Sequence, residues 1–456
     1  MNTPRVMITS PASGSGKTTI TCGILQALKN RGKSPVSGKC GPDYIDPMFH
    51  EAVLKIPSEN LDLFFCQEEV VKTLLKNHAK QGDITILEGA MGYYDGQALN
   101  SWKGSAYDVA KVTDTPVILV IPCKGMALSL VPVIQGMLSF RKDHHIRGVI
   151  LNQISQGMYG RMKEMLEEHL EIPVLGYVPP LSFFSLQSRH LGLVTPGERV
   201  GLSEEIEVLG NLLEQTIDLD ALTAIAQSAP PLLTSWNLEL EPQSKEAAPV
   251  RIAVAKDEAF CFYYRDNLTL LEKLGCELTF FSPIRDHELP VGTRGLLLGG
   301  GYPELYAKKL SENHEMRESI RVAVTKGLPC IAECGGFMYL QEMLEEKDGT
   351  KYPMVGAIKG VSFPTGKLVR FGYVTLESQQ EQGYLPKGET LKGHEFHHWD
   401  STHPGTACLA VKPEREKSWN CIHAKEHLFA GYPHLHFYSN PKFAQRFVAL
   451  CREEKK

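Results

Sequence analysis

Short runs of consecutive apolar residues recur along the chain and are separated by amphipathic stretches. Within each run the apolar residues are continuous and do not alternate with polar ones, which indicates strands buried on both faces, as in parallel sheets covered by helices. The chain is therefore predicted to be an α/β protein with mainly parallel, doubly wound sheets. The predicted strands cover residues 5–10, 84–87, 117–121, 148–152, 173–179, 251–255 and 295–298.

The pattern loosens from about residue 218 to residue 250. Ser-Ala-Pro-Pro at residues 228–231 interrupts any regular element, and residues 239–249 are mostly polar. A second series of strands and helices, including a helix over 267–274, follows this stretch. A chain of 456 residues is also long enough for two or three domains. We predict an N-terminal domain over 1–235, a linker over 236–249 and a C-terminal domain over 250–456.

The first strand leads into a loop rich in Ser and Gly and then into a helix predicted over 20–30. In such a loop, backbone amides bind phosphate oxygens, Lys17 neutralises the β- and γ-phosphates of a nucleotide, and the Thr18 hydroxyl can bind Mg²⁺. Pro11 stands where the common pattern has its first Gly, so the loop is similar to the deviant P-loops of the dethiobiotin synthetase and MinD group. The predicted nucleotide-binding residues are Gly14, Ser15, Gly16, Lys17, Thr18 and Thr19.

Acidic residues follow two predicted elements of the N-terminal half. Asp43 and Asp46 lie in a stretch over residues 38–47 that is predicted to be an ordered loop and not a strand, and Glu88 ends the strand over 84–87. A carboxylate at the carboxyl end of a buried strand in a P-loop fold is placed to bind Mg²⁺ or position water. One acid alone would equally suit a helix cap, but several at strand ends favour a cation site. Arg189 could contact an anionic substrate, although a surface ion pair is an equal alternative.

The most informative stretch lies at residues 327–340, where an apolar strand ends at Cys334 and two glycines precede an apolar helix. The glycines allow backbone angles that other residues resist, so the thiol lies at the tip of a sharp turn. We expect the amides of the new helix to favour the thiolate. A buried structural cysteine is the alternative.

Two histidines, His434 and His436, lie in a predicted alternating strand over 432–437. A thiolate with a histidine base is an acyl-transfer pair. Three glycines at 299–301 end another strand, and bare amides there suit an oxyanion, although a tight turn would account for them equally. The sequence therefore predicts catalysis at Cys334.

Residues 394–398 read His-Glu-Phe-His-His and match the H-E-x-x-H pattern of zinc proteases. That pattern binds zinc only on a helix, where both histidines share a face. Gly393 before it and Pro404 after it indicate a strand and a turn. A zinc site is not predicted.

Composition narrows the function further. A net charge of −5 leaves no basic surface for nucleic acid. Eleven cysteines without C-x-x-C spacing indicate reduced thiols, so we expect a cytoplasmic protein without disulfides. The chain enters its first strand directly, and no apolar run reaches about 18 residues, so neither a signal peptide nor a membrane span is expected.

Taken in order, these motifs resemble the cobyrinate/nickel-sirohydrochlorin a,c-diamide synthase family over nearly the whole chain. The resemblance implies a dethiobiotin-synthetase-like ATPase domain fused to a class I glutamine amidotransferase domain with a flavodoxin-like fold. It also implies amidation of the a and c acetates of cobyrinic acid through acyl phosphates, with ATP, Mg²⁺ and L-glutamine, in cobalamin biosynthesis. The motifs lie at residues 11–19, 41–47, 88–96, 301–304, 333–336, 393–397 and 434–437.

The resemblance also assigns roles to residues. It implies Cys334 as nucleophile and His434 as base, with His436 as the alternative base. Many class I amidotransferases follow the base with Pro-Glu, whereas Leu435 and His436 follow here, so the group that orients His434 stays open. The remaining implied residues are the Mg²⁺ ligands Thr18, Asp43 and Glu88, the synthetase-site residues Tyr44 and Asp95, and the oxyanion amides near Gly300 and Gly335.

Three alternatives stay open at this point. The nickel-sirohydrochlorin enzyme of coenzyme F430 biosynthesis shares the architecture, and cobyric acid synthase is a further relative. From another class, a MinD/ParA-like switch ATPase would share the P-loop, but Ala12 stands where that group has its signature Lys. The sequence does not give the order of a and c amidation, the route of ammonia or the oligomeric state, for which a homodimer is one option. Tyr93, Tyr94 and His190 are candidates for the macrocycle-binding face.

Overall fold

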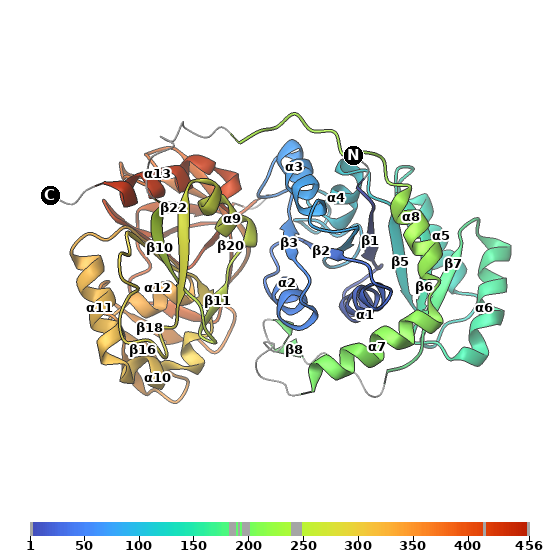
Figure 1. The fold of residues 1–456 in the computed structure, drawn as a ribbon, viewed down its shortest axis with the longest axis horizontal. Coiled ribbons are helices and arrows are strands. Elements are labelled where there is room, and N and C mark those ends of the chain that lie inside the picture. The colour runs from blue at the N-terminus through green and yellow to red at the C-terminus, as the bar shows by residue number, and fades with distance from the viewer. Residues whose placement is uncertain are drawn as a thin grey trace. The chain divides into compact units, whose positions relative to one another are not determined.

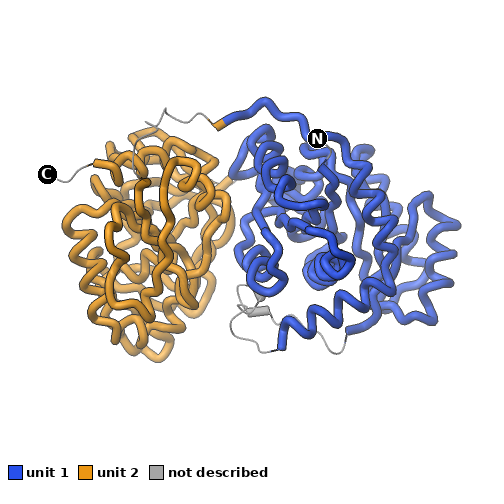
Figure 2. Tube along the Cα trace, viewed as in Figure 1, with its two compact units in different colours: residues 1–237 blue, residues 238–456 orange. Residues whose placement is uncertain are grey.

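The computed structural model describes residues 3–181, 188–189, 192–193, 201–238, 249–413 and 416–453. The chain divides into two compact units, residues 1–237 and residues 238–456 (Figure 2). Most of the predicted linker, and the side chains of Arg189 and His190, lie outside the described residues. Within these residues no helix combines the length and the apolar character that a membrane crossing requires.

The first unit is built on a seven-stranded sheet in the order β3-β2-β4-β1-β5-β6-β7 (Figure 1). Every neighbouring pair is parallel, and the strands are almost fully buried, as continuous apolarity predicts. The predicted fold class is confirmed. The strands are β1 (Arg5–Thr9), β2 (Pro35–Cys40), β3 (Ser58–Leu61), β4 (Ile84–Glu88), β5 (Val117–Pro122), β6 (Ile146–Asn152) and β7 (Val174–Val178).

Two local predictions for this unit are wrong. The stretch over 38–47, predicted as a loop and not a strand, begins with the last three residues of β2 and ends in a short helix, α2 (Ile45–Phe49), whose Ile45 and Asp46 amides donate to the Asp43 side chain just before the helix. The loosened pattern after residue 218 begins with α8 (Leu219–Gln227), which Asp218 caps. The other helices are α1 (Lys17–Asn30), the π-helix η1 (His50–Leu54), α3 (Glu68–Ala79), α4 (Ala106–Val112), α5 (Leu130–Ser139), α6 (Gln156–His169) and α7 (Leu202–Thr216), and β8 (Ser188–Arg189) pairs with β9 (Gly192–Leu193).

The second unit contains a six-stranded sheet in the order β12-β10-β13-β15-β25-β24, parallel except for its last pair. Its strands are β10 (Val250–Ala255), β12 (Cys276–Phe281), β13 (Gly295–Leu298), β15 (Cys330–Glu333), β24 (His423–Lys425) and β25 (Leu428–Gly431). Its helices are α9 (Arg265–Lys273), the 3₁₀ helix η3 (Pro303–Leu305), α10 (Ala307–Glu312), α11 (His314–Thr325), α12 (Gly335–Leu340) and α13 (Pro441–Arg452).

Two further sheets of this unit were not predicted. An antiparallel sheet has the order β23-β22-β19-β20-β26, and a mixed sheet the order β17-β16-β18-β21. The strands are β16 (Met343–Glu345), β17 (Lys351–Pro353), β18 (Val361–Pro364), β19 (Arg370–Ser378), β20 (Thr390–His397), β21 (Trp399–Ser401), β22 (Cys408–Val411), β23 (Ser418–Cys421) and β26 (His434–Leu435), while β11 (Phe260–Phe262) pairs with β14 (Gly300–Gly301).

The antiparallel sheet that contains β20 and β26 decides two of the sequence predictions. The H-E-x-x-H stretch runs through β20 and into the turn before β21, as predicted, so its histidines do not share a helix face. The predicted strand over 432–437 is wrong in length, because only His434 and Leu435 pair with β20 before the 3₁₀ helix η4 (Phe437–Ser439) begins.

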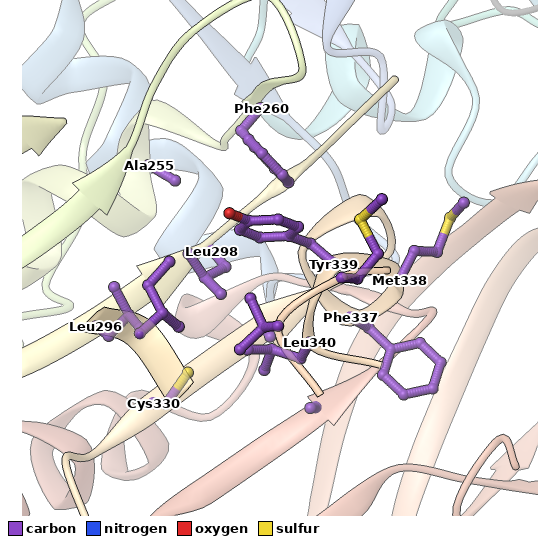
Figure 3. Packing of buried hydrophobic residues seen from close by; sticks show 14 of the residues in the cluster. Ala255, Phe260, Leu296, Leu298, Cys330, Phe337, Met338, Tyr339 and Leu340 are labelled. Carbon is purple, nitrogen blue, oxygen red and sulfur yellow. The ribbon is translucent and has the colours of Figure 1, made fainter. Parts of the chain in front are cut away.

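The largest described apolar cluster of the second unit surrounds the β15–α12 turn (Figure 3). Cys330 of β15 and Phe337, Tyr339 and Leu340 of α12 are all fully buried in it. Both arms of the turn are therefore anchored in close-packed core, which leaves little freedom for the residue between them.

In the first unit, a close helix crossing fixes the helix that follows the P-loop. A Cβ atom added to Gly23 of α1 would lie 2.4 Å from Leu213 Cδ1 of α7 and 3.0 Å from Leu209 Cγ. Glycine at this point lets α7 lie directly against α1, and any side chain would push the helices apart.

We predict that Gly23→Val lowers the free energy of unfolding by about 1–3 kcal/mol through overpacking. Gly160→Ala in α6 is the matched control, because a Cβ there meets nothing within 4 Å; it should raise stability by about 1 kcal/mol through helix propensity. Chemical denaturation of both variants measures the difference. Equal stability of the Gly23→Val variant and the unmodified protein would contradict this account of the helix crossing.

Candidate functional site

The P-loop of the first unit needs glycine at the start of α1. Gly16 has φ 89°, in the left-handed region, and caps the helix. The side-chain amide of Asn152 donates to the Ser15 carbonyl at 2.9 Å. A Cβ on Gly16 would lie 2.4 Å from Asn152 Nδ2. The loop is therefore held against the end of β6, with the amides of residues 17–19 at the free N-terminus of α1, as anion binding requires.

Lys17 lies across this loop. Its Nζ donates to Ser10 Oγ at 2.9 Å, to the Ala12 carbonyl at 3.1 Å and to the Met91 carbonyl at 2.6 Å. Burial, and next the Lys39 ammonium, lower the pKa of Lys17 to about 8. All three acceptors are neutral oxygens, so a phosphate group would be a stronger partner for this ammonium.

A buried lysine gathers the acidic residues of the site. Lys39 Nζ donates to Glu88 Oε1 at 2.7 Å and to Asp46 Oδ2, and Asp43 Oδ2 is 3.9 Å away. Thr18 Oγ1 donates to the same Glu88 oxygen at 2.6 Å. The structure thus brings together the predicted ligands Thr18, Asp43 and Glu88.

Burial and Lys39 act on these carboxyl groups in opposite directions. Burial raises the pKa of Glu88 to about 7 and that of Asp43 to about 6, against the effect of the ammonium. Burial also raises the pKa of Asp46, but the Lys39 ammonium outweighs burial there, and the pKa is lowered overall. Lys39 is thus the positive charge that allows three acids to share a buried site.

Sequence reasoning missed Lys39 and did not assign a role to Asp46. The sequence carries no signal for this role, because the residues of β2, Pro-Val-Ser-Gly-Lys-Cys, do not show that the strand is buried along its whole length; once it is buried, an unpaired lysine there would be costly.

Mg²⁺ prefers oxygen ligands, and the acidic cluster around Lys39 has an oxygen atom that is available to bind it. Glu88 Oε2 is buried and has no hydrogen-bond partner among the described residues, so one carboxylate oxygen is available for a cation. Thr18, Asp43 and Glu88 together supply the hard oxygen donors that Mg²⁺ prefers.

The other predicted residues of this unit lie nearby. Tyr44 is buried at the N-cap of α2, next to Asp43. Asp95 accepts from the Gly92 amide at 3.0 Å, in the loop whose Met91 carbonyl binds Lys17. Tyr93 and Tyr94 do not present free hydroxyls to a ligand, because each donates to a backbone carbonyl, that of His144 and that of Met137.

In the second unit, Cys334 has a strained backbone. Its φ is 48° and its ψ is −103°, a conformation that residues other than glycine rarely adopt. The Cys334 amide donates to the Gly431 carbonyl at 2.8 Å, and the Gly336 amide to the Gly299 carbonyl at 2.9 Å. A Cβ on Gly336 would lie 2.2 Å from the Leu298 carbonyl oxygen, so only glycine allows β13 to pack this closely against the turn.

The two candidate bases have different surroundings. A Cβ on Gly300 would lie 2.2 Å from His434 Cε1, so this ring packs directly on the 299–301 loop that also binds the cysteine turn. The His436 ring instead contacts Tyr264 and Tyr438, with ring centroids 5.1 and 6.3 Å away. Geometry therefore favours His434 over His436 as the partner of Cys334.

Burial leaves both members of this pair uncharged. It raises the pKa of the Cys334 thiol, an effect that Glu304 increases and the Gly335 amide opposes. It also lowers the pKa of His434 to about 3. The Gly335 amide of α12 does favour the thiolate, as expected, but burial outweighs its effect on the pKa. A neutral imidazole is, however, the form that can accept a proton.

Each half of the chain matches a known protein family. Residues 6–193 match the CobQ/CobB/MinD/ParA nucleotide binding domain, and residues 251–442 match the CobB/CobQ-like glutamine amidotransferase domain. The first match includes the P-loop and the acidic cluster, and the second includes Cys334, His434 and His436.

Full-length relatives are similar over almost the entire chain. A protein named cobyrinate a,c-diamide synthase from Listeria innocua is 40% identical, covering 96% of this chain and 97% of its own. One of the same name from Caldanaerobacter subterraneus is 40% identical over 98% of each chain, and one from Priestia megaterium is 36% identical over 100% of this chain and 99% of its own. The chain therefore belongs to the cobyrinate a,c-diamide synthase family, which confirms the predicted family and the predicted enzyme class, a glutamine-hydrolysing ligase.

Proposed function

We propose that the protein amidates the a and c acetate carboxylates of cobyrinic acid, with ATP as energy source and L-glutamine as nitrogen source. The observation that carries the proposal is that one chain holds a P-loop beside a cluster of acids and, in its second unit, a strained cysteine turn and a histidine that both contact the 299–301 loop. The substrate is inferred from the name that the full-length relatives share. We assign the synthetase to residues 1–235 and the glutaminase to residues 250–456, joined by 236–249.

The synthetase half has to activate a carboxylate, which is a poor electrophile. Transfer of the γ-phosphoryl group of ATP to the carboxylate gives an acyl phosphate and ADP, and ammonia then displaces phosphate to form the amide. Such transfer depends on positioning and charge neutralisation. Residues Gly14 to Thr19 bind the phosphates, and Lys17 exchanges its neutral oxygen partners for phosphate oxygens.

Mg²⁺, held by Thr18, Asp43 and Glu88, would neutralise charge on the phosphates when bound. The Lys39 ammonium lies among the same acids and keeps their oxygens directed into the site. Tyr44 and Asp95, next to Asp43 and Lys17 respectively, are assigned to substrate orientation.

The glutaminase half releases ammonia through a thioester. His434 takes the Cys334 proton as sulfur attacks the side-chain amide carbon of glutamine, and amides near Gly300 and Gly335 stabilise the oxyanion. His434 then gives its proton to the leaving ammonia. Water, deprotonated by the same imidazole, hydrolyses the thioester to glutamate and restores the thiol.

Among the alternatives, the nickel-sirohydrochlorin enzyme differs only in the macrocycle that it binds. The macrocycle brings its own metal, so no metal ligand of this chain distinguishes a cobalt substrate from a nickel one. A switch ATPase of the MinD/ParA type would share the first unit alone and has no use for Cys334 and His434.

We predict that Cys334→Ala abolishes glutamine hydrolysis, by more than about 10³-fold, because no other group can form the thioester. Cys276→Ala, which removes a buried thiol from β12, should keep hydrolysis near the unmodified level. A coupled glutamate assay measures both. The Cys334→Ala variant should still form the diamide with ammonium at alkaline pH, where free NH₃ is abundant. Absence of that rescue would contradict the two-site mechanism.

Glu88→Gln should reduce diamide formation by at least about 10²-fold, because it removes a charge from the cation site, while glutamine hydrolysis survives. Asp143→Asn is the control, since this carboxylate pairs with Lys111 at 2.9 Å and is half exposed. Product is measured by mass spectrometry and glutamate by enzymatic assay. If Glu88→Gln loses both activities, Glu88 is needed for the fold and not specifically for the synthetase.

The substrate is decided by supplying cobyrinic acid and nickel-sirohydrochlorin separately. We expect cobyrinic acid to gain two amide groups, with two ATP and two glutamine consumed per macrocycle, and nickel-sirohydrochlorin to react far more slowly. Mass spectrometry of the macrocycle gives the result. Preferential amidation of nickel-sirohydrochlorin would reassign the substrate and leave the ligase mechanism intact.

A further inference from the structure

The candidate base His434 is followed by Leu435 and His436, so no acidic residue stands close after it in the chain. The structure brings a carboxylate to it from elsewhere. Glu333, the last residue of β15 and the neighbour of Cys334, has its Oε2 atom 4.0 Å from His434 Nδ1. Both side chains are buried, with Glu333 only 6% exposed.

Glu333 also holds the backbone that follows His434. The Leu435 amide donates to the Glu333 carboxylate. At the carbonyl of the same residue, Asn267 Nδ2 donates to Leu435 O at 2.7 Å, and the Phe437 amide donates to Asn267 Oδ1 at 2.8 Å. The short strand β26 is therefore fixed by two buried side chains, from β15 and α9.

We propose that Glu333 is the positioning residue of the glutaminase site, directing the imidazole of His434 through Nδ1 and the Leu435 amide so that Nε2 serves Cys334. This inference rests on the proposed glutaminase function. The nucleophile and the group that orients its base are thus adjacent in sequence, at the end of one core strand. The 4.0 Å separation is an ion-pair distance and not a hydrogen bond, so the carboxylate acts on Nδ1 by stabilising the imidazolium that forms when the thiol loses its proton.

The surroundings of Glu333 agree with such a role. Burial raises the pKa of its carboxyl group to about 8, so its negative charge is costly unless a positive partner is near. An imidazolium at 4.0 Å is such a partner, and it forms during the reaction.

Glu333→Gln separates charge from anchoring, because the amide oxygen still accepts from Leu435 while the charge is lost. We expect kcat for glutamine hydrolysis to fall at least about tenfold, with KM changed less than about threefold. Alkylation of Cys334 by iodoacetamide, followed by peptide mass spectrometry, should slow in parallel. Ammonia-dependent amidation should stay unchanged. Glu389→Gln, which removes a half-buried carboxylate paired with Arg446 at 2.6 Å, is the matched control and should leave all of these values unchanged.

Glu333→Asp keeps the charge and gives a second, independent comparison. It should hydrolyse glutamine faster than Glu333→Gln at similar melting temperature. The proposal is overturned if Glu333→Gln retains the kcat and alkylation rate of the unmodified protein, or if a folded Glu333→Asp variant is no faster than the Gln variant. Failure of the glutaminase function itself would appear separately, as unchanged hydrolysis in Cys334→Ala.

Discussion

The strained backbone of Cys334 is the constraint on which the second unit depends. A residue with φ 48° and ψ −103° is disfavoured by about 1–3 kcal/mol, so the fold has to hold it from both sides. Strand β15 does so through its parallel pairing with β25, and α12 does so through its buried Phe337 and Tyr339. The core around the turn thus fixes the direction of the thiol, with Gly336 against Leu298 of β13 and Gly335 against Pro303.

In the first unit the corresponding constraint is electrostatic. Three carboxyl groups share a buried space, and mutual repulsion and burial would both keep them protonated. Lys39 offsets this cost through direct contacts with Asp46 and Glu88. The lysine lies in β2, one strand away from the P-loop strand β1 across β4, so the sheet order itself places the compensating charge next to Thr18.

The fold could be predicted from the sequence in those segments that carry a single clear pattern. Continuous apolar strands and the Gly-Lys-Thr loop determine the first sheet, and the Cys-Gly-Gly turn after an apolar strand identified the elbow. The role of Lys39 could not be read, because nothing in a single sequence tells a buried lysine from a solvated one. Helix α2 was missed since Asp43, which accepts from its first amides, was interpreted only as a ligand. The choice between His434 and His436 likewise depends on which ring reaches Gly300, a long-range contact that spacing does not contain.

The electrostatics of the two sites differ in the way that their chemistries require. Phosphoryl transfer develops charge that must be met by fixed partners, and the first unit provides Lys17 and Lys39 as standing positive charges. Amide hydrolysis requires a proton to move from sulfur to nitrogen and on to ammonia. In the second unit burial raises the pKa of the Cys334 thiol and lowers that of His434, so it favours the uncharged forms of both groups before glutamine reacts. Placing the Glu333 carboxylate beside that imidazole lets charge appear only when glutamine reacts, which limits the separation of charge in a buried site to the moment of catalysis.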